Sequence, residues 1–400
     1  MLVMSEGARI HPVYAGMDMT IFDVMSGLAR ELGAINLGQG FPDEQGPPEL
    51  IEAAARALRE KSNQYPPGSG LPDLRDAICA FYARRQGLSL SREQVVVTSG
   101  ATEGIADAVL ALVCPGDEVI LFQPAYDAYA PMVRRAGGLP VSIPLAPPDW
   151  RYRAGDLAAA ITAKTRVVML NDPLNPAGTC ASEAELAGIA ELCVAHDLTV
   201  ISDEVWEEVR FDGAVHRSIM TFPGMAQRTV KLGSAGKVFG LTGWKTGWMV
   251  AAPELAQGLA RAHQFVTYTT PPALQWAVAE GLGLPDQWFE TRTAGWSASR
   301  ERLRAGLERA GYRVLPNAAT WFLCVDLAAS GIAFDDRRFS ERLVREAGVA
   351  SIPVSALFEG SKEFGAPRHI VRFCFTKPDA MLDEAADRLG TFRRSLSPLP

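Results

Sequence analysis

The stretch Leu232-Gly233-Ser234-Ala235-Gly236-Lys237-Val238-Phe239-Gly240-Leu241-Thr242-Gly243-Trp244-Lys245 is the most informative segment of this chain. An apolar run typical of a β-strand, 229–232, leads into small residues that let the backbone approach a bound group closely. Lys237 is a candidate nucleophile, because a lysine amine condenses with carbonyl groups and becomes more reactive when it is desolvated. Ser234 and Lys245 stand close enough along the chain to reach a phosphate group.

Length, composition and charge limit the class of protein. The 400 residues are 48% hydrophobic and 21% charged, which supplies a large core and predicts two domains. The formal net charge of −7, without a concentrated basic patch, argues against nucleic acid as a partner. No run is long and apolar enough to predict a membrane span, so we expect no membrane partner.

The cysteines and histidines show no spacing typical of a metal site. Several cysteines lie in apolar runs without CxxC or CxxH spacing, and we expect buried thiols in a reducing compartment. Residues 1–7 lack the charged and apolar regions of a signal peptide, so we expect a cytoplasmic protein without a bound metal. The six cysteines are Cys79, Cys114, Cys180, Cys193, Cys324 and Cys374.

Strand-like and helix-like segments alternate through the middle of the chain. This alternation predicts an α/β protein with a mostly parallel seven-stranded sheet covered by helices on both faces. After residue 253 the pattern changes to several helices, a long polar helix near 286–310 and short strands, which predicts a smaller α/β domain. We expect an N-terminal arm joining the small domain (1–45), a large cofactor-binding domain (46–285) and a small domain (286–400). The expected strands of the large sheet are 95–98, 118–122, 140–143, 166–170, 198–202, 229–232 and 248–252.

The polar residues that stand out follow these strands, where ligands gather in parallel α/β sheets. The turn 99–102 opens a helix, and helix N-terminal amides bind anions. Tyr126, the Asn-Pro loop 171–176, the acidic segment 202–206 and Lys237 follow other strands. Taken singly, each is typical of an ordinary turn or cap. Together they supply what pyridoxal phosphate requires: an anion site, a flat neighbour, a donor, a carboxylate and an amine.

These segments resemble the fold-type I pyridoxal-phosphate aminotransferases over nearly the whole chain. The resemblance is specific to the branch that contains kynurenine aminotransferase, glutamine transaminase K and methionine aminotransferase. It is carried by the 233–248 segment, nearly residue for residue, and by Asp203-Glu-Val, Asn175-Pro and Asn63-Gln-Tyr in the expected order. The resemblance also implies a homodimer with active sites at the subunit interface.

Carried over position by position, the resemblance implies a role for each site residue. Lys237 would form the Schiff base and shuttle the substrate Cα proton, and Asp203 would keep the pyridine nitrogen protonated. Arg372 would bind the substrate carboxylate as a two-pronged pair, which ammonium does not match. Tyr126 would stack on the cofactor ring, and Asn175 would donate to its phenolic oxygen. The phosphate would be held by Gly100, Ala101, Thr102, Ser234, Lys245 and, from the neighbouring subunit, Tyr65.

Two features bear on how this chain differs from its family. The family generally has a tyrosine at position 206 that donates to the phenolic oxygen of the cofactor, whereas this chain has Trp206. Its indole N–H replaces that donor or its ring simply packs, and the residue type leaves both open. Phe22, Gly38 and, from the partner, Tyr268 align with the side-chain pocket, which favours apolar or aromatic substrates unless these aromatics only fill the core or interface.

Three activities fit this site. We expect transamination between a 2-oxo acid and an apolar, aromatic or sulfur-containing L-amino acid such as methionine, glutamine or kynurenine. Cysteine-conjugate β-elimination would use the same residues. N-succinyl-diaminopimelate aminotransfer would need further cationic residues in the pocket, and none is identifiable from the sequence. A non-catalytic ligand-sensing module is disfavoured, because the 45 residues before the first expected helix leave no room for a DNA-binding domain.

Overall fold

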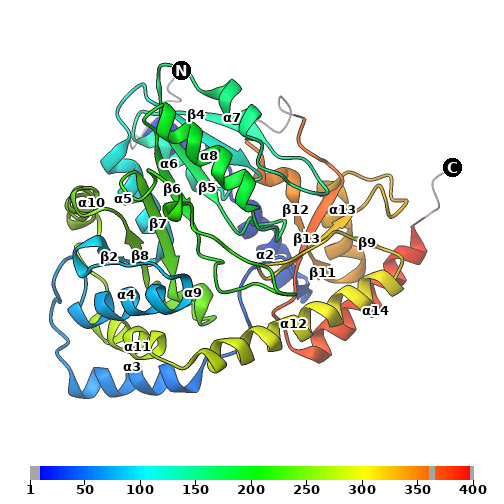
Figure 1. Cartoon of the computed structure of the whole chain (residues 1–400). Coiled ribbons are helices and arrows are strands. Elements are labelled where there is room, and N and C mark those ends of the chain that lie inside the picture. The colour runs from blue at the N-terminus through cyan, green and yellow to red at the C-terminus, as the bar shows by residue number, and fades with distance from the viewer. Residues whose placement is uncertain (1–9, 360–364, 397–400) are drawn as a thin grey trace.

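The computed structural model describes residues 10–359 and 365–396, and it is built around a large twisted sheet (Figure 1). The strand order in the described chain is β2-β8-β7-β6-β5-β3-β4, and every pairing is parallel except the two made by β8. The carboxyl ends of β3, β5, β6 and β7 therefore meet at one edge of the sheet. The strands are β2 (Val95–Thr98), β3 (Glu118–Gln123), β4 (Leu139–Pro144), β5 (Thr165–Asn171), β6 (Thr199–Asp203), β7 (Thr229–Ser234) and β8 (Gly247–Val250).

Both faces of the large sheet are buried, which explains why its strands are apolar without alternation. On one face, Leu121 and Ile201 pack with Ile105 and Leu259 from α5 and α10. On the other face, residues one position along the strands, such as Phe122 and Leu170, pack against α7 and α8. The helices of this lobe are α3 (Pro48–Glu60), α4 (Pro72–Gln86), α5 (Gly100–Leu112), α6 (Tyr129–Arg135), α7 (Ala154–Ala160), α8 (Glu183–Ala195), α9 (Ala235–Val238), α10 (Pro253–Val266) and α11 (Pro272–Leu282), with 3₁₀ turns η1 (Arg92–Gln94), η2 (Ile219–Thr221) and η3 (Thr242–Trp244).

A smaller antiparallel sheet, ordered β12-β13-β10-β9, forms the second lobe. Helix α12 (Asp286–Arg309) runs along the bottom of Figure 1 toward this lobe and packs against α14 (Asp379–Ser395). The other elements are β9 (Arg313–Val314), β10 (Phe322–Asp326), α13 (Asp336–Arg342), the π-helical turn η4 (Leu343–Ala347), β11 (Val349–Ala350), β12 (Ile352–Pro353), η5 (Val354–Leu357) and β13 (Ile370–Cys374).

The N-terminal segment lies against the small lobe. Strand β1 (Ile35–Asn36) pairs in parallel with β11, and α2 (Ile21–Glu31) packs beside it, after the short helix α1 (Pro12–Ala15). The Leu37 carbonyl then accepts from the Cys374 amide, at 2.7 Å, so the chain continues alongside β13. This pairing brings residues 38–41 to the edge of the large sheet where the polar loops gather.

The predicted fold class is confirmed, including the mostly parallel seven-stranded sheet and the smaller α/β lobe. The division at residues 45 and 285 stays a prediction. The cysteine prediction was wrong in part, because Cys114 is exposed and Cys79 and Cys180 are partly exposed; only the other three are buried. Residues 1–7, where no signal peptide was predicted, lie outside the described residues. Among the described helices, none is long and apolar enough to cross a membrane.

Candidate active site

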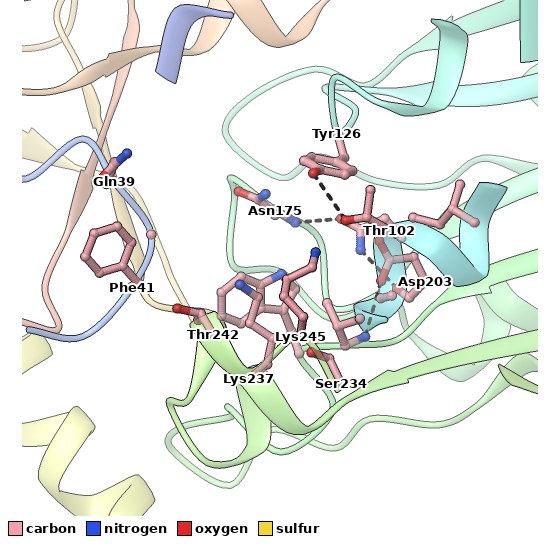
Figure 2. Close-up of a pocket in the computed structure, with 18 of the residues that line it drawn as sticks. Gln39, Phe41, Thr102, Tyr126, Asn175, Asp203, Ser234, Lys237, Thr242 and Lys245 are labelled. Atoms are coloured by element: carbon pink, nitrogen blue, oxygen red, sulfur yellow. Dashed lines mark hydrogen bonds between the residues drawn. The ribbon is translucent and has the colours of Figure 1, made fainter. Parts of the chain in front are cut away.

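A pocket of about 340 Å³ opens at the carboxyl edge of the large sheet, between that sheet and the segment 38–41. In Figure 2, Gln39 and Phe41 face the pocket from the N-terminal segment, opposite Tyr126, Asn175 and Asp203. Its lining includes these predicted residues: Phe22, Gly100, Ala101, Thr102, Tyr126, Asn175, Asp203, Trp206, Ser234, Lys237, Lys245 and Arg372. Segments far apart in the sequence are therefore brought together around one cavity.

Lys237 projects into this pocket from the short helix α9, directly after β7 (Figure 2). Its Nζ lies 4.9 Å from the ring centroid of Trp206 and 5.4 Å from that of Trp321. Burial disfavours the charged form and lowers the pKa of Lys237 to about 8, although Asp203 opposes this change. About a tenth of the amine is therefore unprotonated at pH 7, against fewer than about one in a thousand for an ordinary lysine, and the unprotonated form is the nucleophile.

The predicted phosphate-binding turn lies at the start of α5. Gly100 has φ +75°, and a Cβ there would approach the Lys245 Nζ to 3.2 Å, so glycine leaves room for the ammonium. The N-cap residue Ser99 makes no side-chain hydrogen bond to the first turn, whose amides are thus left for a ligand. The N-terminus of α5, the Lys245 ammonium and the Ser234 hydroxyl line the same pocket and could together hold an anion.

Asp203 ends β6 and is buried, 7% exposed. Its carboxylate accepts a hydrogen bond from the Tyr129 hydroxyl at 2.5 Å and one from the Val205 amide at 3.4 Å. Burial nevertheless raises the pKa of Asp203, because these contacts do not replace full solvation. A cationic partner in the pocket would offset this cost.

A buried ion network supports the loops that follow β5 and β6. His216 lies between two carboxylates, with Nδ1 3.1 Å from Asp172 Oδ2 and Nε2 2.8 Å from Glu204 Oε2. The Lys231 ammonium also pairs with Glu204 and with Glu207. Burial alone would lower the pKa of His216, but the two carboxylates outweigh it and raise the pKa to about 9. The network joins the segment before Asn175 to the segment that carries Asp203.

Arg372, on β13, is 2% exposed and lies between two aromatic rings. Its Cζ is 3.8 Å from the ring centroid of Phe322 and 5.1 Å from that of Phe22. The guanidinium donates to Asn175 Oδ1 at 3.0 Å and to the Gly38 carbonyl at 2.6 Å. Among the described residues its Nε is buried without an acceptor, so part of the fork is free for a ligand carboxylate.

Three predicted residues do not line this pocket. Gly38 contacts it indirectly, through its carbonyl bond to Arg372. Tyr65 is 84% exposed and Tyr268 is 42% exposed, and their rings stack edge to face with centroids 5.6 Å apart. Both tyrosines are thus available to a second subunit, and their roles stay predictions.

Trp206 packs rather than standing free in the pocket. It is 3% exposed, and its ring meets Trp321 and Phe322 edge to face, with centroids 5.0 and 5.4 Å apart. This contact explains how a larger indole is accommodated where the family has a tyrosine. Whether the Trp206 indole also donates to a cofactor stays a prediction.

Sequence reasoning missed several residues of the site. Tyr129 carries the only side-chain hydroxyl that binds Asp203 in the described chain. Helix α6 begins at Tyr129, three residues after Tyr126, and this closeness to a predicted site residue was the available signal. Asn171 joins Asp203 to Asn175, because its amide donates to the Asp203 carbonyl and its oxygen accepts from the Asn175 amide, both at 3.0 Å. The remaining lining residues not predicted are Gln39, Gly40, Phe41, Ile105, Asn171, Val205, Gly236, Thr242, Thr246 and Phe322.

Taken together, the site offers an amine, a buried carboxylate, an aromatic face and an anion-binding turn within one cavity. The raised pKa of Asp203 shows that its carboxylate lacks a close cationic partner, and the Arg372 Nε–H donor lacks an acceptor, among the described residues. A bound ligand could supply both groups. These residues fit an aromatic aldehyde that carries a ring nitrogen and a phosphate, together with a carboxylic acid.

Comparisons with known proteins show the family of this chain. The model of the family "Aminotransferase class I and II" matches residues 33–389. A probable N-succinyldiaminopimelate aminotransferase of Mycobacterium tuberculosis is 45% identical over 380 residues, covering 93% of this chain and 95% of that protein. The methionine aminotransferase of Escherichia coli is 37% identical over 371 residues, covering 92% and 95%. The solved structure of N-succinyldiaminopimelate aminotransferase from Mycobacterium tuberculosis has a TM-score of 0.91 at 43% identity, covering 96% of this chain and 100% of that one.

Proposed function

The chain belongs to the class I and II aminotransferases, and from this membership we propose that it is a pyridoxal-phosphate-dependent transaminase of L-amino acids and 2-oxo acids. The observation that carries the proposal is the Lys237 amine, which lies in the same pocket as the phosphate-binding turn and has a pKa lowered to about 8 by burial. An ordinary surface lysine has neither the burial nor the neighbouring anion site.

The residues of the pocket would hold the cofactor at both ends. Gly100, Ala101, Thr102, Ser234 and Lys245 would bind the phosphate, and Tyr126 would cover the ring. When bound, pyridoxal phosphate supplies an aldehyde that condenses with amines and a ring that takes up the electron pair left when a Cα–H bond breaks.

The chain's own groups would then carry the proton and the charges. Asp203 would pair with the protonated ring nitrogen, which relieves the cost of burying its carboxylate. Asn175 would donate to the phenolic oxygen through its side-chain amide, while its Oδ1 accepts from Arg372. Lys237 Nζ would take the proton from substrate Cα, and Arg372 would orient the substrate by its carboxylate.

The substrate side chain would meet largely aromatic walls. Phe22, Phe41 and Phe322 line the pocket, and the described cations in it are Lys237, Lys245 and Arg372, each with a role already proposed. This lining favours apolar, aromatic or sulfur-containing L-amino acids. The second candidate is N-succinyl-diaminopimelate, favoured by the 45% identity to the Mycobacterium tuberculosis protein. Its additional carboxylates would require cations that a second subunit or a moved side chain supplies.

We also propose a homodimer in which each subunit completes the site of its partner. The exposed edge-to-face pair of Tyr65 and Tyr268 supports this, because large aromatic side chains this exposed are typical of interface residues. In the dimer, Tyr65 would reach the cofactor phosphate of the neighbouring subunit and Tyr268 its substrate pocket.

A donor panel tests the proposal. Methionine, glutamine, kynurenine, phenylalanine, aspartate and N-succinyl-LL-diaminopimelate are each incubated with several 2-oxo acids, and the products are identified by mass. The new amino acid and keto acid appear together if the enzyme transaminates, whereas ammonia plus pyruvate from a cysteine conjugate reports β-elimination. A preference for N-succinyl-LL-diaminopimelate over methionine by more than about tenfold in kcat/KM would select the second candidate. Failure of every pair would contradict transamination.

A further inference from the structure

A buried cluster of titratable side chains lies beside the phosphate-binding turn but outside the pocket. It consists of Glu103 and Asp107 on α5 and His263 on α10, and all three are buried. The two helices lie side by side at the left of Figure 1. Nothing in the proposed reaction uses this cluster.

Both ring nitrogens of His263 face oxygen atoms that can accept a hydrogen bond. Nε2 lies 3.0 Å from the Gly68 carbonyl oxygen, which only accepts. Nδ1 lies 3.0 Å from Glu103 Oε1, and that carboxylate already accepts from the Ser99 amide and the Thr267 hydroxyl. These contacts favour the ionised form of Glu103. Burial alone would lower the pKa of His263, but Asp107 and Glu103 outweigh it and raise the pKa to about 9, which favours an imidazolium paired with the carboxylate.

A second carboxyl group, that of Asp107, also lies next to His263 and would be compensated by a charged imidazolium. Its Oδ2 lies 3.4 Å from His263 Nδ1, and neither of its carboxyl oxygens has a hydrogen-bond partner among the described residues. Burial and the neighbouring Glu103 raise the pKa of Asp107, so without the imidazolium the two carboxyl groups could not both stay ionised in this buried site.

Through these contacts His263 joins three separate segments. Glu103 directly follows the phosphate-binding residues 100–102, and its bond to the Ser99 amide anchors the start of that helix. Gly68 lies three residues after Tyr65. Tyr268 follows α10, where its amide donates to the His263 carbonyl at 3.1 Å, and it adopts a left-handed φ of +69°. A Cβ at Gly68 would lie 3.4 Å from the Tyr268 carbonyl, so the two tyrosine segments are in contact.

We propose that His263 is a positioning residue that connects the phosphate-binding turn of its own subunit to Tyr65 and Tyr268, and through them to the cofactor site of the partner subunit. The inference rests on the proposed function, in which both tyrosines complete the partner's site. One buried ion pair thus orders two sites at once. Loss of His263 should therefore loosen both the phosphate-binding turn of its own subunit and the segments that carry Tyr65 and Tyr268 to the partner's site.

Hybrid dimers separate these two effects. One subunit carries Lys237→Ala together with His263→Gln, and the other is wild type. Only the wild-type subunit can bind pyridoxal phosphate covalently, so the cofactor that borohydride attaches to the protein reports that site alone. Its own phosphate turn is intact, but its tyrosines come from the altered subunit. The dissociation constant of pyridoxal phosphate is measured on the apo hybrid and compared with that of a hybrid carrying Lys237→Ala alone.

We expect binding at this site to weaken about tenfold, the size of one lost charge-assisted hydrogen bond. A matched control carries Arg300→Gln in place of His263→Gln, since Arg300 is another buried cation, 2% exposed, outside this cluster. That control should lower Tm without changing the dissociation constant. If His263→Gln does not fold, Thr267→Val removes the hydroxyl bond to Glu103 and should weaken binding in the same direction.

Equal dissociation constants in the two hybrids would mean that His263 acts only within its own subunit, and the proposal would be wrong although the proposed function stands. Absence of the visible band in the wild-type enzyme would instead contradict the proposed function. About one divalent ion per chain that is lost in His263→Gln but kept in His216→Gln would also overturn the proposal, because ligand atoms of the three side chains lie within 4.8 Å of one another and a metal would require a neutral imidazole.

Discussion

Replacing Arg372 by lysine is the sharpest test of how this site recognises its substrates. The guanidinium is held by the Gly38 carbonyl, by Asn175 and by the faces of Phe322 and Phe22, which leaves Nε free. An α-carboxylate is common to every amino acid and 2-oxo acid. Arg372→Lys should therefore weaken all of them by a similar factor.

The magnitude follows from the contacts that are lost. Lysine keeps a charge but cannot form the two-pronged pair, and losing one hydrogen bond to a charged group costs ~1.5–3 kcal/mol, or about 10- to 150-fold in affinity. Burial also lowers the pKa of Arg372 to about 10. Because the ordinary pKa of lysine lies about 2 below that of arginine and burial disfavours both charges, the substituted lysine should lose its charge at a lower pH than Arg372 does. The affinity of the variant should therefore fall further than that of the wild type between pH 7 and pH 9.

The assay is spectral titration of the loaded enzyme with an unreactive carboxylic acid at pH 7 and 9, alongside KM and kcat for several substrates. At each pH, the dissociation constant of the variant is divided by that of the wild type. This ratio removes any pH dependence that the Lys237 site contributes equally to both proteins. Arg300→Lys, a second buried arginine that does not line the pocket, is the matched control and should leave these constants unchanged. A loss confined to one substrate, or a change below about threefold for all of them, would refute the carboxylate assignment.

The other predictions concern the amine, the interface, the indole and the buried histidine. Lys237→Ala should abolish turnover while the protein still folds with an unchanged Tm. The wild-type enzyme should be yellow, and borohydride should attach its cofactor to a peptide that contains Lys237. Labelling of another lysine would contradict the assignment. Mixing Tyr65→Phe with Lys237→Ala subunits should restore activity above either parent, because each hybrid holds one site with neither change; hybrids that form but stay inactive would place Tyr65 in its own subunit's site. Trp206→Tyr should lower the pH at which the visible band of the substrate-free enzyme is half titrated. The reason is that a tyrosine hydroxyl donates more strongly to the phenolic oxygen of the cofactor and so competes with the proton that bonds to the same oxygen. Equal midpoints in the two proteins would show that the indole already donates. The pKa of His216 is raised from 6.5 to about 9, so its ion pairs stabilise the fold fully below pH ~6.5 and lose this contribution as the pH rises through about 9. The Tm of the wild type should therefore fall over that pH range. A fall of equal size in His216→Gln would exclude this cause.

Much of the fold could be predicted from local patterns. The strand at 95–98 was predicted with the bounds that β2 has, and the others of the large sheet to within two residues, because fully buried parallel strands are short apolar runs between turns. Most of the candidate site could also be predicted, since Lys237, Asp203 and Asn175 follow such strands and the carboxyl ends of parallel strands meet. Tyr129 and Asn171 could not, because their role depends on which atoms they meet, namely the carboxylate and backbone oxygens of Asp203.

The sequence by itself determined the α/β architecture and the family and indicated Lys237 as the candidate reactive amine, because these depend on residue order and spacing over short segments. Only the tertiary structure decided how the side chains are paired and how strongly their charges are perturbed. Arg372 meets Gly38 and Asn175, and His263 meets Glu103 and Gly68, across separations of 160 to 334 residues. The physical reason is that hydrogen bonds, desolvation and Coulomb interactions act over a few ångströms in space, and spacing along the chain does not encode those distances between remote segments.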